Sequence, residues 1–423
     1  MSEDVFREIL AVCATSWDLL KGEARSKGKS IYELLIKSLW EPAEEELRRR
    51  ASSITPYRFQ LEVFRKLLKI ADEGGVLLVE APTAMGKTEA AMAPFFCQLA
   101  EGSWELAPRL IYMLPTKALT LTSFARLKAY ALGVAKYFST KVLTTSFEFG
   151  STIGIKHYLY GGVLTATTLD AAIYGLVALR VPGGLKCPRL SMPAGLLATS
   201  LMILDEIQLY QDEHYYSPRV IGAVIEPLAK AGVPIVYMTA TLPSALLDTI
   251  IHEEPEVVEA AETRKSQIDV DLSGLRGHKH IPDFLAEKTT LQTMFEVLEE
   301  GRHVLVVANT VRRAVECYRL LRERLGSDKV VIIHGRLANV KRERAEGELF
   351  SSAKVIVATQ VVEAGFDLNA GLLITEVAPL DSLIQRAGRV ARGGGNGLAI
   401  ILDVRNSAPY RKLIAVSYTH LRA

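Results

Sequence analysis

The spacing of hydrophobic positions changes character along the chain. Residues 1–52 show helical spacing and include the charged run EPAEEELRRR. From about Ser53, short apolar runs alternate with segments of helix length, in the order GVLLVEAP, RLIYMLPT, GGVLTATT, LMILDE and PIVYMTAT. After a polar stretch the alternation restarts with HVLVVANT, VVIIHG, KVIVAT, LLITEVA and LAIILDV. Strands that alternate with helices are typical of parallel sheets, so the pattern predicts an α/β fold with two tandem domains.

These changes in pattern suggest boundaries. We expect a helical N-terminal extension over 1–52, a first α/β domain over 53–262, a linker over 263–285 and a second, incomplete α/β domain over 286–416. The final stretch SYTHLRA, residues 417–423, resembles translated sequencing-adaptor sequence. We therefore expect these last residues to be non-biological and the natural protein to continue beyond them.

Composition narrows the class of protein. The chain has 423 residues, of which 49% are hydrophobic and 23% charged, as in soluble globular proteins. The formal net charge is only +2, so a polyanion would have to be held by a local basic strip. The four cysteines are scattered without a C-x-x-C pair, which argues for a reducing compartment and against a zinc site. No membrane span or secretory signal is evident, so we expect a cytoplasmic protein.

A loop between the first strand and the next helix has the chemistry of a phosphate site. The stretch APTAMGKTEAA, residues 81–91, ends in Gly-Lys-Thr at a helix start, where backbone N–H groups and the helix dipole attract anions. Lys87 would reach the phosphates of a nucleotide, and Thr88 would bind Mg²⁺. Ala81 stands where the strict pattern has glycine, and a chance Gly-Lys-Thr is the alternative. The predicted nucleotide-binding residues of this loop are Thr83, Ala84, Met85, Gly86, Lys87, Thr88 and Glu89.

Two carboxylates, Asp205 and Glu206, follow directly on the apolar run LMIL. Buried carboxylates are costly unless they are paired or hold a metal. Ligands of parallel sheets bind at the carboxyl ends of the strands, so both side chains would face the same crevice as Lys87. Asp205 would hold Mg²⁺ together with Thr88, and Glu206 would polarise the water that attacks the γ-phosphate. The predicted cofactors are ATP and Mg²⁺, and the alternative is a solvated acid pair.

These motifs, with others in a fixed order, resemble the superfamily 2 helicases, whose fold consists of two RecA-like domains. The resemblance extends from Pro56 to Arg392. The stretches that carry it are PYRFQ, APTAMGKT, LPTKAL, TATTLD, DEIQ, TAT, ANT, ATQVVEAGFD and QRAGRVAR.

Within that superfamily the chain looks most like the CRISPR-associated helicase of type I interference. The stretches NTVRRAVECYRLL, ATQVVEAGFDLN and ITEVAPLDSLIQRAGRVARGG carry this likeness. Two positions depart from it, since Gln208 stands where that family often has histidine and Ala84 where glycine is common.

The resemblance implies roles for further residues. Gln60 would read the adenine, Asp367 would contact the ribose, and Gln385 would link the γ-phosphate region to the second domain. Arg389 and Arg392 would act as arginine fingers, although "RAGRVAR" could also form a solvated helix face. Further residues would hold one nucleic-acid strand through its phosphates, without sequence preference. For the threonines among them, the alternative explanation is that threonine is common in β-strands. The residues implied in this contact are Thr116, Lys117, Thr165, Thr310, Arg336 and Thr359.

The function implied is an ATP-dependent single-stranded-DNA translocase or helicase that unwinds target DNA at an R-loop opened by a crRNA-guided effector complex. We expect a separate histidine–aspartate (HD-type) nuclease to cut the DNA, because no histidine precedes His157 and no His-Asp dipeptide occurs. The alternative is a nuclease in a missing C-terminal part of the protein. The alternatives are a superfamily 2 DNA-repair or RNA helicase, and a non-catalytic nucleic-acid-binding scaffold.

Overall fold

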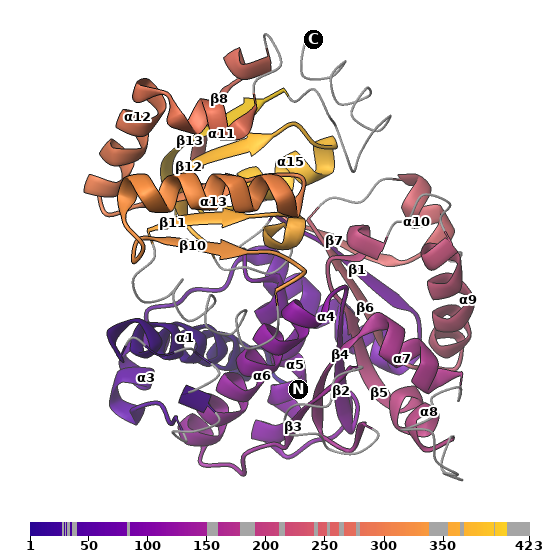
Figure 1. Cartoon of the computed structure of the whole chain (residues 1–423). Helices are drawn as coiled ribbons and strands as arrows, with labels where there is room; N and C mark the ends of the chain where they lie inside the picture. Colours follow the sequence, from indigo (N-terminus) through magenta and orange to yellow (C-terminus); the bar gives the residue numbers. More distant parts are fainter. Residues whose placement is uncertain are drawn as a thin grey trace, which may run out of the picture. The chain divides into compact units, whose positions relative to one another are not determined.

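The computed structural model shows two compact units, each built on one parallel sheet (Figure 1). One unit comprises Met1–Leu20 and Leu35–Thr263, and the other comprises Lys21–Leu34 and Arg264–Ala423. The predicted α/β fold class is thus confirmed. The residues that the structure describes are 1–27, 29, 31, 34–35, 40–82, 85–149, 160–177, 191–210, 216–240, 244–251, 254–261, 266–275, 280–337, 354–363, 368–392 and 394–403.

The sheet of the first unit has the strand order β3-β4-β2-β5-β6-β1-β7, and every pairing is parallel. Its strands are β1 (Val76–Glu80), β2 (Arg109–Leu114), β3 (Thr145–Glu148), β4 (Leu164–Thr168), β5 (Ser200–Leu204), β6 (Ile235–Thr239) and β7 (Glu256–Glu259). The helices are α1 (Glu3–Lys27), α3 (Glu44–Ala51), α4 (Arg58–Glu73), α5 (Lys87–Glu101), α6 (Lys117–Phe138), α7 (Leu169–Leu176), α8 (Ser191–Ala198), η2 (Ile207–Tyr210), α9 (Tyr216–Lys230) and α10 (Ser244–Ile250).

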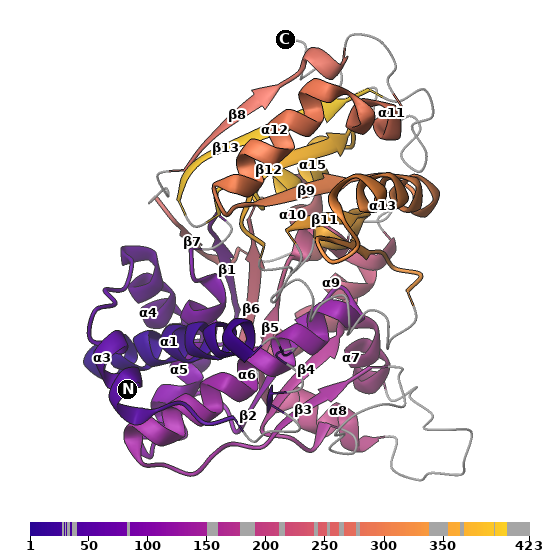
Figure 2. The ribbon, with the colours of Figure 1, turned by 60° about the vertical axis from the view of Figure 1, so that its left-hand side comes forward.

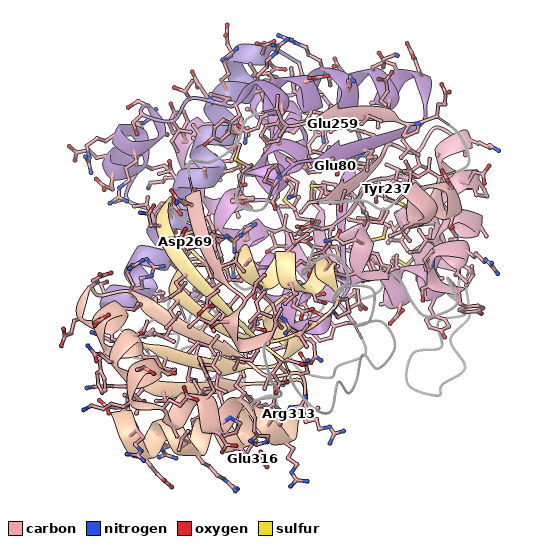
Figure 3. All side chains as sticks on the ribbon, turned by 90° about the horizontal axis from the view of Figure 1, so that it is seen from above. Glu80, Tyr237, Glu259, Asp269, Arg313 and Glu316 are labelled. Atoms are coloured by element: carbon pink, nitrogen blue, oxygen red, sulfur yellow. The ribbon has the colours of Figure 1, made fainter. Side chains whose placement is uncertain are left out.

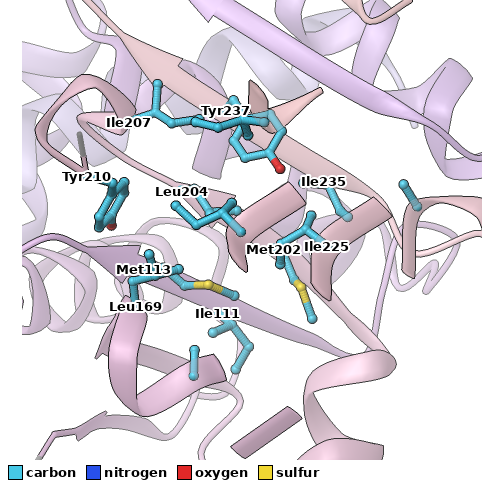
Figure 4. Close-up of a cluster of buried hydrophobic side chains, with 14 of the residues drawn as sticks. Ile111, Met113, Leu169, Met202, Leu204, Ile207, Tyr210, Ile225, Ile235 and Tyr237 are labelled. Atoms are coloured by element: carbon cyan, nitrogen blue, oxygen red, sulfur yellow. The ribbon is translucent and has the colours of Figure 1, made fainter. Parts of the chain in front are cut away.

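Helices cover both faces of this sheet, which explains why its central strands read as continuous apolar runs. On one face, α7 to α10 pack on a cluster that includes Met113, Met202, Leu204 and Tyr237 (Figure 4). Helices α4 and α6 contact the strands as well, α4 at β1 and β7 and α6 at β2 to β4. All five residues of β5 are buried, so the carboxylates of Asp205 and Glu206 directly follow a strand that is shielded from water.

The N-terminal extension is helical, as predicted, and α1 packs closely on the helices of the first sheet (Figure 2). Phe6 stacks on Phe64 of α4, with ring centroids 4.5 Å apart. On α6, a Cβ at Gly133 would lie 1.8 Å from Oγ of Ser16. Only glycine lets the two helices approach this closely, so residues 3–20 of α1 belong to the core of the first unit.

The sheet of the second unit has the order β10-β11-β9-β12-β13-β8 and is also parallel throughout. Its strands are β8 (Ser266–Asp271), β9 (His303–Val307), β10 (Val330–Ile333), β11 (Val355–Ala358), β12 (Ala370–Glu376) and β13 (Gly395–Leu402). The helices are η3 (Ser273–Leu275), α11 (Ile281–Ala286), α12 (Lys288–Glu299), α13 (Val311–Leu325), η4 (Gln360–Val362) and α15 (Leu380–Ala387).

Strand β8 and all but the last residue of helix α11 lie within the range 263–285 that the sequence pattern marked as a linker. The stretch instead completes the second sheet, because β8 pairs with β13 from Ser266 to Asp271. β8 is an edge strand, and its residues Gln267 and Asp269 are exposed. Figure 3 labels Asp269 on this strand. An edge strand with polar outward positions has no apolar run, which is why hydrophobic periodicity did not find it.

A buried ion pair ties β12 to α13 in the second unit. Nε of Arg313 lies 2.6 Å from Oε1 of Glu376, whose side chain is fully buried. The backbone N–H of Asn309, at the end of β9, donates to the other carboxylate oxygen at 2.6 Å.

Among the described residues, no helix is long and apolar enough to cross a membrane.

Candidate active site

The phosphate-loop motif lies at the carboxyl end of β1, where helix α5 begins. Gly86 is the N-cap of this helix and lies in the left-handed region, with φ of 82°; as a glycine it has no side chain to cap the first N–H groups of α5. A Cβ at Gly86 would lie 2.6 Å from Nε2 of Gln60. The conformation and the close approach both require glycine. Thr83 and Ala84 lie outside the described residues.

Gln60 uses its amide to hold this loop. Oε1 accepts from the backbone N–H of Tyr57 at 2.9 Å, and Nε2 donates to the carbonyls of Met85 and Gly86 at 3.3 and 3.1 Å. The side chain is buried in this arrangement. Gln60 therefore joins the start of α4 to the phosphate loop, and adenine recognition by the same amide stays a prediction.

Lys87, the first residue of α5, folds back over the loop. Its ammonium group donates to the carbonyls of Ala81 and of Pro82, the latter at 3.2 Å, and the side chain is 8% exposed. Neutral carbonyls are weaker partners for a cation than phosphate oxygens are. A phosphate group at this loop would thus offer Lys87 a better partner close to its present position.

Asp205 stands at the end of β5, and its backbone N–H donates to the carbonyl of Met113 on the neighbouring β2 at 3.0 Å. The hydroxyl of Tyr112 donates to Oδ2 of Asp205. Burial raises the pKa of Asp205 to about 6, and the charge of Glu206 adds to the rise, while the Lys87 ammonium opposes it. A carboxylate that is costly to ionise here would be stabilised by a cation.

Thr88 completes the expected metal-binding pair. Its hydroxyl oxygen accepts a hydrogen bond of 3.1 Å from Nη1 of Arg126 on α6. Thr88 and Asp205 both interact with Tyr112, which brings them to one place although 117 residues separate them. A hydroxyl and a carboxylate beside a lysine and a helix N-terminus fit Mg²⁺ bound to a nucleotide. Thr88 and Asp205 are the residues that would hold this ion.

Glu206 adopts an unusual backbone conformation, with φ of 51°. Its N–H donates to Oδ1 of Asp205 at 2.9 Å, and Oε2 accepts from the amide of Gln208 at 2.7 Å. Gln208 in turn accepts from the hydroxyl of Thr239 at 2.7 Å. Left-handed conformations of residues other than glycine are strained and occur often at functional sites. At the carboxyl end of β5, this strained backbone lets the adjacent carboxylates of Asp205 and Glu206 bind different partners, Tyr112 and Gln208.

Glu89 has a partner other than the one we predicted. Its side chain accepts a hydrogen bond from the hydroxyl of Tyr130 on α6. The carboxylate therefore ties α5 to α6, and a role of Glu89 in nucleotide binding would fall to its backbone N–H in the first turn of α5.

In the second unit, three arginines of QRAGRVAR have different environments. Arg386 is fully buried, 2.7 Å from Oε1 of Glu363, and also donates to Oγ1 of Thr375 at 2.7 Å. Nη2 of Arg389 donates to the carbonyl of Glu363 at 2.5 Å, and Arg392 is half-buried. Arg386 is thus a structural residue.

Two further features surround these arginines. Ala391 has φ of 48°, so the backbone turns sharply between the two predicted arginine fingers, Arg389 and Arg392. Gln385 is 6% exposed, and its amide forms no hydrogen bond within the described part of the chain. Buried amides normally have partners, so a contact of Gln385 with a ligand stays a prediction. Asp367 lies outside the described residues.

Two of the predicted nucleic-acid contacts are helix N-caps at the carboxyl edges of the sheets. The hydroxyl of Thr116 accepts from the N–H of Leu119 at 3.3 Å, and that of Thr310 accepts from the N–H of Arg313 at 3.4 Å. Helix N-termini bind phosphate groups readily. The side chain of Lys117 lies outside the described part.

The remaining predicted contacts differ in exposure. Thr165 is fully buried within β4, and its hydroxyl pairs with that of Ser146 at 2.8 Å, so the prediction that it touches a nucleic-acid strand is wrong for this structure. Its position in the strand interior, three residues before the end of β4, explains this. Thr359 follows β11 and is 5% exposed, whereas Arg336 is exposed.

Two residues of the site were missed by the sequence analysis. Tyr112 lies in the buried strand RLIYML, where a phenol requires a hydrogen-bond partner, and this could have pointed to it. Arg126 lies in a helix among apolar residues, and nothing local distinguishes it from a solvated arginine.

Two family models match the chain. The model of DEAD/DEAH box helicases matches residues 57–249, and the model described as CRISPR-associated nuclease/helicase Cas3, C-terminal, matches residues 300–394. The CRISPR-associated helicase Cas3 of Thermoproteus tenax is 35% identical over 346 residues, which are 79% of this chain and 57% of that protein. The CRISPR-associated nuclease/helicase Cas3 of Streptococcus thermophilus is 26% identical, over 84% of this chain and 44% of its own length. The chain thus spans about half the length of these relatives.

Solved structures show the same fold. The T. fusca Cas3–AMPPNP structure matches with a TM-score of 0.63 and 20% identity, over 90% of this chain and 53% of that one. The structure of Mss116p bound to ssRNA and AMP-PNP matches with a TM-score of 0.62 and 16% identity, over 92% of this chain and 78% of that one. Both units therefore have the fold of helicase RecA-like domains.

Proposed function

Because the chain belongs to the Cas3 family of CRISPR-associated helicases, we propose that it hydrolyses ATP and uses the energy to move along and unwind nucleic acid. The observation that carries this proposal is the meeting of Lys87, Thr88, Asp205 and Glu206 at the carboxyl edge of the first sheet. A non-catalytic scaffold would not require a strained glutamate beside a carboxylate of raised pKa.

Each of these side chains has a distinct task in the proposed reaction. Lys87 binds the phosphates, and Thr88 and Asp205 hold Mg²⁺, which neutralises charge on the phosphate oxygens when it is bound. Glu206 orients the attacking water and accepts its proton. Gln208 fixes the carboxylate of Glu206 for this purpose.

The second unit would supply the remaining groups. We place Arg389 and Arg392 as arginine fingers, Gln385 as a contact to the γ-phosphate region and Asp367 as a contact to the ribose. The sharp turn at Ala391 supports separate directions for the two arginines.

The proposed nucleic-acid substrate is one strand of target DNA at an R-loop opened by a crRNA-guided complex in the cytoplasm. The relatives are named as a CRISPR-associated helicase and a CRISPR-associated nuclease/helicase, and these names support a role beside a CRISPR complex. Thr116 and Thr310, as N-caps, would bind strand phosphates, together with Lys117, Arg336 and Thr359. The structure of Mss116p, which matches this fold, contains ssRNA. Measuring ATP hydrolysis with single-stranded DNA and with single-stranded RNA therefore decides which nucleic acid is the substrate.

We further propose that a separate HD-type nuclease cuts the unwound DNA. Within the described residues, no three His, Cys, Asp or Glu side chains gather as they would around a metal ion.

The central experiment measures ATP hydrolysis with and without single-stranded DNA. We expect stimulation by the strand, loss of nucleotide binding in Lys87→Ala, and loss of hydrolysis with intact nucleotide binding in Glu206→Gln. Lys66→Ala, on the surface of α4, is a matched control that should hydrolyse ATP normally. A folded Glu206→Gln protein with unchanged hydrolysis would show that the base has been assigned wrongly.

A further inference from the structure

Arg126 of α6 reaches the nucleotide site from outside the sequence motifs. Its Nη1 donates to the hydroxyl of Thr88 at 3.1 Å. The guanidinium carbon lies 5.0 Å from the centroid of the Trp17 ring, which belongs to α1 and is 3% exposed. The arginine is therefore held between an aromatic ring of the N-terminal helix and a predicted metal ligand.

Helix α1 is well anchored for such a role. Its contacts to Phe64 of α4 and Gly133 of α6 reach the two helices that carry Gln60 and Arg126. A cation over an indole ring is stabilised by about 0.5–1 kcal/mol where it is solvated and by more where it is desolvated. The planar guanidinium can stack on the ring and still donate sideways, which an ammonium group cannot do in the same way.

Both predicted metal ligands have a fixed partner beyond the phosphate loop. Tyr112 donates to Asp205, and Arg126 donates to Thr88. A hydroxyl oxygen has two lone pairs, so a bond from Arg126 fixes the orientation of Thr88 and leaves one lone pair for a metal ion. The positive charge of Arg126 repels a cation, but two carboxylates and a triphosphate would outweigh it. The orienting effect of Arg126 on Thr88 should therefore outweigh its repulsion of the metal ion.

We infer that Arg126 is a positioning residue for Thr88 in Mg²⁺ binding, and that Trp17 keeps it in place. Helix α1 then contributes to the nucleotide site through the contact of Trp17 with Arg126. This inference rests on the proposed ATPase function.

The test is the binding of a fluorescent non-hydrolysable ATP analogue to the whole chain, titrated with Mg²⁺ and repeated in EDTA. Partners of metal ligands typically contribute about 10- to 100-fold to metal affinity, so we expect Arg126→Met to raise the Mg²⁺ concentration for half-maximal binding about tenfold. Affinity in EDTA should stay at the wild-type value, because Lys87 and the loop are untouched. Trp17→Leu should shift the Mg²⁺ requirement about threefold in the same direction, and Trp17→Phe less.

Arg48→Met is the matched control. Arg48 also lies over an aromatic ring of α6, 4.5 Å from the centroid of Tyr137, but it has no hydrogen bond to Thr88. We expect its Mg²⁺ titration to be that of the wild type. Should Arg126→Met not fold, Arg126→Lys serves instead, with a shift in the same direction.

Two results would overturn the inference: an unchanged Mg²⁺ requirement in a folded Arg126 variant, or an equal loss of affinity in EDTA and in Mg²⁺, which would indicate general damage. Failure of the proposed function is distinguishable, since the wild-type chain would then not bind the analogue at any Mg²⁺ concentration.

Discussion

The amide of Gln208 donates a hydrogen bond of 2.7 Å to Oε2 of Glu206. The same side chain accepts from Thr239 at the end of β6, so the glutamate is held by a side chain that is itself held by the neighbouring strand. Position 208 is where the resembled helicases often have histidine. Glutamine donates without a change of charge, so the positioning of Glu206 does not depend on protonation at this position.

The first prediction follows from this pair. Gln208→Leu should lower kcat for ATP hydrolysis by about 10- to 100-fold and leave nucleotide affinity intact, because a misplaced base affects only the chemical step. Gln208→His should retain more activity, and Gln292→Leu, at an exposed glutamine of α12, should behave as wild type. Steady-state kinetics and analogue binding measure the two quantities. A fall in affinity equal to the fall in kcat would contradict the positioning role.

The second prediction concerns stability and the pKa of Asp205, which is about 6 against an ordinary value of 3.8. The nucleotide-free folded state favours the protonated form, so this stabilising contribution is complete below pH 3.8 and is lost as the pH rises through 6. The stability of Asp205→Asn relative to the wild type should therefore increase from pH 5 to pH 8 by about 1.4 kcal/mol, since the rest of the contribution is already lost at pH 5. Urea unfolding at both pH values, without nucleotide, measures the difference. A difference that is the same at both pH values would argue against the shifted carboxyl.

The third prediction separates the arginines of QRAGRVAR. Arg386→Met should lower the free energy of unfolding by about 3–5 kcal/mol, because it leaves the partner carboxylate of Glu363 without its cation. Arg389→Ala and Arg392→Ala should instead lower the rate of hydrolysis about a thousandfold with little change in ATP affinity. Denaturant unfolding and ATPase kinetics are compared for all three variants. Equal destabilisation of the three would mean that the motif serves only the fold.

The fourth prediction concerns strand binding. Arg336→Ala should weaken single-stranded DNA binding equally for different sequences and reduce the salt slope of the affinity by about 1, since one phosphate contact is lost. Arg324→Ala, at an exposed position of α13, is the control. Fluorescence anisotropy at several salt concentrations gives both quantities. A strong preference of the wild type for one sequence at fixed salt would contradict the translocase proposal.

The fifth prediction is that the chain itself does not degrade DNA. Purified protein is incubated with single-stranded DNA, ATP and Mn²⁺, Co²⁺ or Ni²⁺, and the DNA is analysed for cleavage. We expect intact DNA, because the proposed nuclease is a separate protein. Chelator-sensitive cleavage that remains after repurification and is unchanged in Glu206→Gln would show that the chain carries a nuclease site of its own.

The sequence alone determined the two parallel sheets, the phosphate loop and the carboxylate pair. These features are local, since a buried strand is a run of apolar residues and a loop that binds phosphate places glycine, lysine and threonine side by side. Because parallel strands present their carboxyl ends at one edge, the sequence also predicted that Lys87, Thr88 and Asp205 would meet.

Tertiary structure alone decided which other side chains reach this edge. The contacts of Arg126 with Thr88 and Trp17 join three helices, and no spacing along the chain encodes them. The burial of Thr165 depends on its place within β4 and on Ser146 in the adjacent strand. Strand β8 escaped notice because an edge strand needs little apolar surface. Patterns of neighbouring residues specify the elements, whereas a side chain's partner depends on which elements pack against it.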